Sequence, residues 1–134
     1  MKQIGIWLDK QQADCVVFEN GVEKFFTIPS NMEFFNPKGG SRSKTRWGPQ
    51  DVVQDSKYLE REKHQLKRYF ENLVTSVKIA DQLAIFGPAE TADKFLAYLE
   101  KDHHRLALKV KALDKADSMT DNQFKALARS VFGI

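Results

Sequence analysis

Three cations alternate with hydroxyl-bearing residues in one short segment, and an aromatic residue follows directly. Arg42, Lys44 and Arg46 are each separated by a serine or threonine, and Trp47 comes next. In an extended segment, alternate side chains project to one side, so these cations can meet successive phosphates of a nucleic acid. Trp47 can stack on an RNA base or fold back and anchor the segment. The pattern indicates RNA binding.

Positive charge is concentrated around this segment. Residues 38–68 hold nine basic and four acidic side chains, so they carry +5 while the rest of the chain carries −2. Such a distribution favours a polyanionic partner, although a solvated loop and helix face would have the same composition. The expected RNA-binding residues are Lys38, Gly39, Gly40, Arg42, Lys44, Arg46, Trp47, Arg61 and Arg68.

A metal-dependent nuclease is an alternative, because Asp9 ends an apolar run where such enzymes place a metal-binding carboxylate. A magnesium site needs several convergent carboxylates. Asp14 and Asp81 are the available partners, and the sequence brings neither clearly toward Asp9. An aspartate at a strand end is commonly a turn former, so we expect no metal and no cofactor.

The histidines and the single cysteine also favour structural roles. His103 and His104 are adjacent and His64 is distant, so no ligand set with the spacing of a metal site is complete. Cys15 lies in an apolar run without a neighbouring base, which is typical of a small core residue. With no apolar signal segment at the start of the chain, we expect a cytoplasmic location.

The first third of the chain reads as a meander of three strands. Residues 4–8, 13–19 and 22–28 are apolar runs separated by polar breaks. Asn20-Gly21 between two such runs is a strong hairpin signal, because a type I′ turn needs positive φ at both central residues. We therefore expect three antiparallel strands at the start of one domain, residues 1–134.

Residues 31–55 differ, because they are rich in glycine, proline and basic residues and show little periodicity. We expect a mobile basic loop there. Apolar residues then recur at helical spacing over residues 56–76. A buried strand is expected at 82–86, a helix opening with Pro88 in its first turn, and a strand at 106–112. Thr120 to Gln123 forms a capping box for a last helix that closes at Gly133.

The expected fold is therefore α/β, with a mixed five-stranded sheet and the order β-β-β-α-β-α-β-α. This is the order of ribonuclease H-like domains and of the middle domain in translation termination factors. No apolar run approaches the length of about 20 residues needed to cross a membrane, so we expect no membrane partner.

Three motifs favour the second of these families. They are Gly39-Gly40-Ser41-Arg42-Ser43, Tyr58-Leu59-Glu60-Arg61-Glu62-Lys63-His64, and Leu83-Ala84-Ile85-Phe86-Gly87-Pro88-Ala89-Glu90 with Lys94-Phe95. Over nearly the whole chain, these and the element order resemble the middle domain of the eukaryotic and archaeal class-one release factor and of Pelota. The chain looks like a stand-alone bacterial relative of that domain.

The resemblance implies that this chain acts on the ribosome. In the release factor, a Gly-Gly-Gln loop enters the peptidyl-transferase centre and helps water attack the peptidyl-tRNA ester. Here Ser41 follows the glycine pair, which resembles Pelota, a protein that lacks the glutamine and does not hydrolyse. A second alignment places Gly48-Pro49-Gln50 near the family glutamine, which makes Gln50 the alternative catalytic candidate. Pro49 supplies neither a backbone N–H nor positive φ.

We therefore expect a domain that associates with the ribosome or with structured RNA in translation, rescue or ribosome protection, without hydrolysis. The enzymatic alternatives are peptidyl-tRNA hydrolase and metal-dependent nuclease. The remaining alternative is a protein-interaction module.

Overall fold

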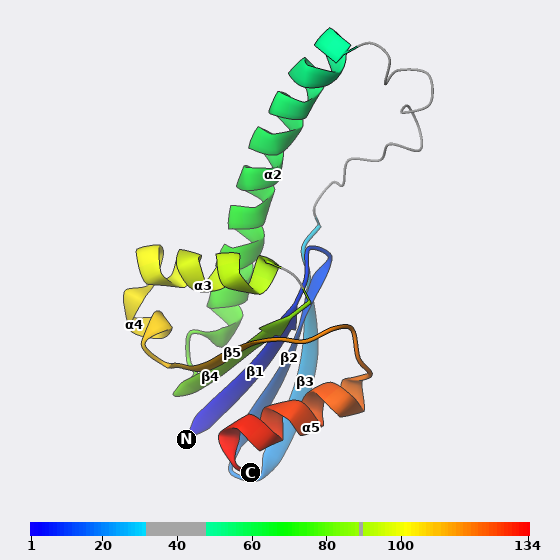
Figure 1. The fold of residues 1–134 in the computed structure, drawn as a ribbon. Helices are drawn as coiled ribbons and strands as arrows, with labels where there is room; N and C mark the ends of the chain where they lie inside the picture. Colours follow the sequence, from blue (N-terminus) through cyan, green and yellow to red (C-terminus); the bar gives the residue numbers. More distant parts are fainter. Residues whose placement is uncertain (32–47, 89) are drawn as a thin grey trace.

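The computed structural model describes residues 1–31, 48–88 and 90–134, and for residues 48–59 it describes the backbone only. Figure 1 shows a sheet with helices on both faces. Along the chain the elements are β1 (Lys2–Leu8), β2 (Gln12–Glu19), β3 (Val22–Pro29), α2 (Gly48–Val77), β4 (Gln82–Gly87), α3 (Thr91–Asp102), α4 (His104–Ala107), β5 (Val110–Lys115) and α5 (Asp121–Phe132).

The five strands form one mixed sheet in the order β3-β2-β1-β4-β5. The first three strands pair antiparallel, whereas β4 pairs parallel with β1 and β5 pairs parallel with β4. Asn20 and Gly21 join β2 to β3 with φ of 53° and 79°, so the predicted hairpin turn is confirmed. The predicted α/β class and the five-stranded mixed sheet are confirmed as well.

Each face of the sheet has its own hydrophobic core. On one face, Ile4, Ile6 and Ile85 pack among buried residues of α2 and α3. On the other face, Trp7 and Phe86 pack against α5. Residues 4–8 are buried on both faces, as their unbroken apolar run predicted, because a central strand covered by helices meets no water on either side.

The helix α2 begins at Gly48, eight residues before the position that periodicity predicted. The expected loop over residues 31–55 is therefore wrong for residues 48–55. Pro49 lies in the first turn, where no intrahelical partner exists for an N–H and the fixed φ of proline suits a helix. The glycine and proline that we interpreted as loop residues instead begin this helix.

Two other boundaries differ from the prediction. Helix α3 begins at Thr91 after Glu90, so Pro88 precedes the helix instead of lying in its first turn. The strand expected at 106–112 is β5 at Val110–Lys115, preceded by α4. A single helical turn buries Leu106 and leaves Leu108 72% exposed, so their alternate spacing does not reflect a strand.

The helix α5 begins and ends at the capping residues that the sequence analysis predicted. Thr120 Oγ1 accepts from the backbone N–H of Gln123, and the Gln123 side chain accepts from the backbone N–H of Thr120. Gly133 ends the helix in the left-handed conformation. The predicted capping box and the glycine stop are both confirmed, because each depends on neighbours in the chain.

Candidate nucleic-acid interface

Helix α2 is anchored to the sheet through its C-terminal half. Tyr69, Phe70, Leu73 and Val77 are buried in the core beneath the helix. Tyr69 also donates from its hydroxyl to the carbonyl oxygen of Asp9 at 2.9 Å. With 30 residues the helix is about 45 Å long, and Figure 1 shows its N-terminal half extending beyond the sheet.

Two predicted RNA-binding residues lie on the described part of this helix. Arg61 and Arg68 are both exposed and are seven residues apart, so they lie on nearly the same face of the helix. Phe70 and Leu73 point to the opposite side, into the core. The structure therefore places Arg61 and Arg68 on a solvent-facing surface, which we call the arginine face.

The other predicted RNA contacts lie outside the described residues. They are Lys38, Gly39, Gly40, Arg42, Lys44, Arg46 and Trp47. Their role stays a prediction from the sequence.

Gln50 lies in the first turn of α2, and its side chain is outside the described part. The second alignment of the family loop required Gly48-Pro49-Gln50 to be a loop. The helix contradicts that requirement. Gln50 is therefore a helical residue, and its backbone does not have the loop conformation that the alternative assumed.

Of the three aspartates considered for a metal site, Asp9 and Asp14 line one cavity and Asp81 lies apart from them. Asp9 Oδ1 accepts from the backbone N–H groups of Gln11 and Gln12 at 2.8 and 3.0 Å, which is the turn-forming role. Asp14 lines the same small cavity of about 300 Å³ as Asp9. Asp81 lies at the other end of β1, where its carboxylate accepts from the backbone N–H of Lys2 at 2.7 Å.

The carboxylates of Asp9 and Asp121 lie near that of Asp14, and the three residues line one cavity. Burial raises the pKa of Asp14, while a hydrogen bond from Thr27 lowers it in part. Among residues 1–31, 48–88 and 90–134, no group of three or more His, Cys, Asp or Glu side chains could hold a metal ion. The structure gives the nuclease alternative no support.

The cysteine is buried in the core, and one histidine makes a hydrogen bond between elements. Cys15 is fully buried, and burial raises the pKa of its thiol, as is typical of a structural cysteine. His103 separates α3 from α4, and its Nε2 shares a hydrogen bond of 3.2 Å with the Tyr98 hydroxyl. His103 is half-buried and His104 is exposed, and both lie just beyond the end of α3.

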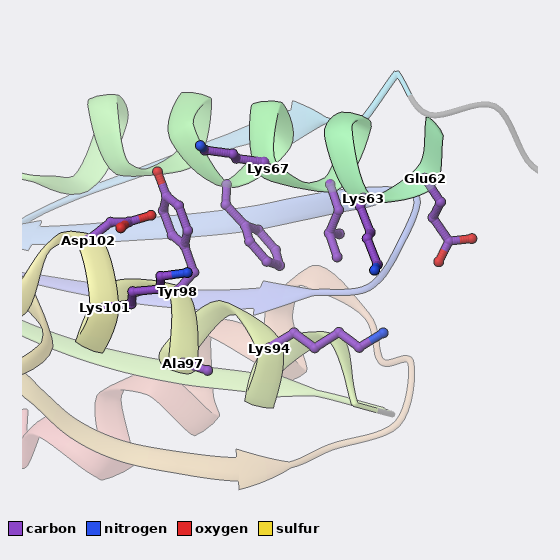
Figure 2. Close-up of a pocket in the computed structure, with 10 residues that line it drawn as sticks. Glu62, Lys63, Lys67, Lys94, Ala97, Tyr98, Lys101 and Asp102 are labelled. Atoms are coloured by element: carbon purple, nitrogen blue, oxygen red, sulfur yellow. The ribbon is translucent and has the colours of Figure 1, made fainter. Parts of the chain in front are cut away.

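A groove between α2 and α3 is a feature that the sequence analysis missed. It has a volume of about 540 Å³, and Leu66, Phe70, Ala97 and Tyr98 form its apolar lining. Four lysines border it, with Lys63 and Lys67 on α2 and Lys94 and Lys101 on α3 (Figure 2). The helical spacing of each lysine pair was visible in the sequence, but which helices face each other was not.

These elements define a three-layer mixed α/β domain with one long projecting helix. Its structure is similar to that of the archaeal translation termination factor aRF1, with a TM-score of 0.63 and 9% identity over 99% of this chain and 35% of that chain. Pelota from Archaeoglobus fulgidus matches with a TM-score of 0.58 and 12% identity over 98% of this chain and 33% of Pelota.

Pelota from Thermoplasma acidophilum matches with a TM-score of 0.57 and 15% identity, over 97% of this chain and 32% of that protein. The chain thus spans about a third of each of these proteins. It has a fold like the middle domain of Pelota and aRF1, which confirms the resemblance inferred from the sequence.

No protein-family model and no curated protein sequence matches it. Within the described ranges, no helix is both long enough and apolar enough to cross a membrane.

Proposed function

We propose that this chain is a release-factor-like domain that associates with the ribosome and acts in translation, in ribosome rescue or in ribosome protection. The observation that carries this proposal is the likeness of nearly the entire chain to one region of three translation-related proteins. A ribosomal partner would also place the protein in the cytoplasm, as the sequence analysis expected.

The contact surface that we propose combines the basic segment before α2 with the arginine face. Arg61 lies near the middle of α2 and Arg68 lies in the half that is anchored to the sheet, and both are exposed on the side away from the core. A large RNA can therefore approach them from the solvent side of the helix. Lys38, Arg42, Lys44, Arg46 and Trp47 precede this helix and add charge and a base-stacking group. RNA binding of this kind draws much of its affinity from phosphate contacts.

We further propose that the domain acts without hydrolysing peptidyl-tRNA. In one of the two alignments that the resemblance allows, Ser41 follows the Gly39-Gly40 pair in place of the release-factor glutamine. Gln50, the alternative, lies in a helical turn. Neither residue gives the chain a Gly-Gly-Gln loop that could position water against the ester.

Co-sedimentation of the purified protein with ribosomes at increasing salt tests the proposal. We expect the protein to enter the ribosomal pellet at low salt and to be released as salt rises, because counterions compete for the phosphates. A variant with Arg61→Glu and Arg68→Glu should pellet less.

The matched control reverses the same amount of charge elsewhere. Lys111 lies exposed on the edge strand β5, and Lys78 lies exposed just after α2. Lys78→Glu with Lys111→Glu should leave pelleting unchanged. Equal loss in both double variants, or no pelleting of the parent protein, would contradict the proposal.

A further inference from the structure

The base of the groove between α2 and α3, which we call the floor, consists of apolar side chains that pack against one another. The ring of Phe70 from α2 lies 5.1 Å from that of Phe95 and 5.6 Å from that of Tyr98, both on α3, measured between centroids. The Tyr98 hydroxyl is held by His103. Leu66 and Ala97 complete the floor. Because these side chains are packed against one another, the floor exists before any ligand binds.

Three of the four lysines along the groove make no ion pair with the described residues, and the carboxylates of Glu71 and Asp102 lie near Tyr98. Lys94 pairs at 3.2 Å with Glu90, the residue directly before α3. Lys63, Lys67 and Lys101 have no ion-pair partner within the described part of the chain. Three ammonium groups with no ion-pair partner among the described residues border an apolar floor, and they favour a ligand that is both acidic and apolar.

The two ends of the groove carry the opposite charge. Glu62 and Asp102 lie at opposite ends (Figure 2), and Glu62 is held by Lys10 at 3.5 Å. On each helix the bordering lysines span between one and two turns, so the basic part is about 10 Å long. A ligand with negative charge confined to that length fits, whereas a long polyanion would have to pass a carboxylate at each end.

We propose that this groove binds a short acidic amphipathic helix from a protein partner. Such a helix would place apolar side chains one turn apart on the floor, against Leu66 and Ala97, and carboxylates beside Lys63, Lys67 and Lys101. RNA fits less well because Tyr98 is the one half-exposed ring among the described lining residues, whereas Phe70 is buried. It also fits less well because arginine, which recognises phosphates in two-pronged geometry, is absent from the lining.

The groove is separate from the surface proposed to meet the ribosome. Arg61 and Arg68 lie on the side of α2 opposite to Leu66 and Phe70, by the helical repeat of 3.6 residues. A protein bound in the groove would therefore leave the arginine face open. The two proposals can fail independently of each other.

The test uses the full chain and a fluorescein-labelled helical peptide of about 12 residues, which is about three turns. The peptide carries leucines at positions i and i+4 with glutamates beside them. We expect it to bind with micromolar affinity, measured by fluorescence anisotropy. Replacing both Lys67→Glu and Lys101→Glu should weaken binding by at least about tenfold, because two attractions become repulsions.

The control is Arg68→Glu with Lys111→Glu, which changes net charge equally but lies outside the groove. It should alter peptide affinity by less than about twofold, the size of a screened long-range effect. A second variant, Ala97→Trp, fills the floor from an exposed position and should abolish binding without lowering the unfolding temperature.

Three results would overturn the proposal. The parent protein could fail to bind the acidic peptide, or both double variants could lose affinity equally. A single-stranded RNA of about 12 nucleotides, a length that fits common single-strand binding sites, could bind in place of the peptide and lose affinity in the groove variants. Ribosome pelleting of the groove variants is measured in the same series. It tests the proposed ribosome association and not the binding of the acidic peptide.

Discussion

Gly5 on β1 lies so close to α5 that a β-carbon added to it would be 2.8 Å from the Cβ of Ala128. The same added atom would lie 3.3 Å from Cγ1 of Val16 on the neighbouring strand. Real β-carbons do not approach each other this closely, so α5 can rest on this face of the sheet only where the strand has no side chain. The pair of small residues thus sets the distance between helix and sheet.

We expect Gly5→Ala to lower the free energy of unfolding by about 1–3 kcal/mol, the usual cost of overpacking a core. Urea unfolding measures the loss. Ala128→Gly costs about 1 kcal/mol by itself, because glycine weakens a helix, but it opens the space that the new methyl group needs. The cost of Gly5→Ala should therefore be smaller in the Ala128→Gly background. An equal cost in both backgrounds would show that the contact is not the cause.

Stability should fall at alkaline pH because of buried groups that resist ionisation. Burial raises the pKa of the Cys15 thiol from its ordinary value of 9.0 and that of the Tyr69 hydroxyl from 10.0. Both groups stay protonated in the folded protein while the unfolded chain loses protons. Their stabilisation is therefore fully present below about pH 9 and is lost as the pH rises above that value.

Urea unfolding between about pH 8 and pH 10, the range where the unfolded thiol ionises, checks this expectation. Cys15→Ala should be less stable throughout, because it leaves a small cavity, yet its stability should fall less steeply with pH. If the slope is the same in both proteins, Cys15 does not contribute to it.

Replacing Arg42, Lys44 and Arg46 with alanine should weaken ribosome or RNA binding and leave folding almost unchanged. Each phosphate contact to a single strand contributes about −0.7 to the slope of log affinity against log salt. Losing three contacts should flatten that slope by roughly 2 units. Titrations at several salt concentrations measure the slope, and thermal unfolding serves as the control. An unchanged slope would remove this segment from the proposed surface.

The purified protein should not release the peptide from peptidyl-tRNA above the rate without protein. Gln50→Ala should then behave like the parent, since Gln50 belongs to the first turn of α2. Release assays on ribosomes carrying a labelled peptidyl-tRNA test this. Turnover by the parent protein that disappears in Gln50→Ala would contradict the proposal and favour the hydrolase alternative.

Features that depend on neighbouring residues were predictable from the sequence. The turn at Asn20 and Gly21, the cap at Thr120 and the glycine stop at Gly133 each require a particular local conformation that few residues adopt. The boundaries of helices and strands were less predictable, because the same residue type is compatible with different local structures. Pro49 is compatible with a loop or with a first helical turn, and the structure shows the helical turn.

The candidate sites were predictable only in part. Arg61 and Arg68 are spaced for one helix face, and that spacing placed them together before the fold was known. The groove could not be predicted from the sequence. Lys63 and Lys101 are 38 residues apart in the chain, and they border the same groove only because α2 and α3 pack on the same face of the sheet.

By itself, the sequence determined the α/β class, the mixed sheet and the concentration of positive charge, because periodicity and composition are local properties. The element order that it predicted lacked only α4. The tertiary structure alone decided the rest. It buried Leu106 through a turn of helix and put Asp81 at the opposite end of β1 from Asp9. It also set Gly5 against Ala128. In each case the outcome depends on which elements share a face of the sheet, and the burial of apolar surface between distant segments settles that choice.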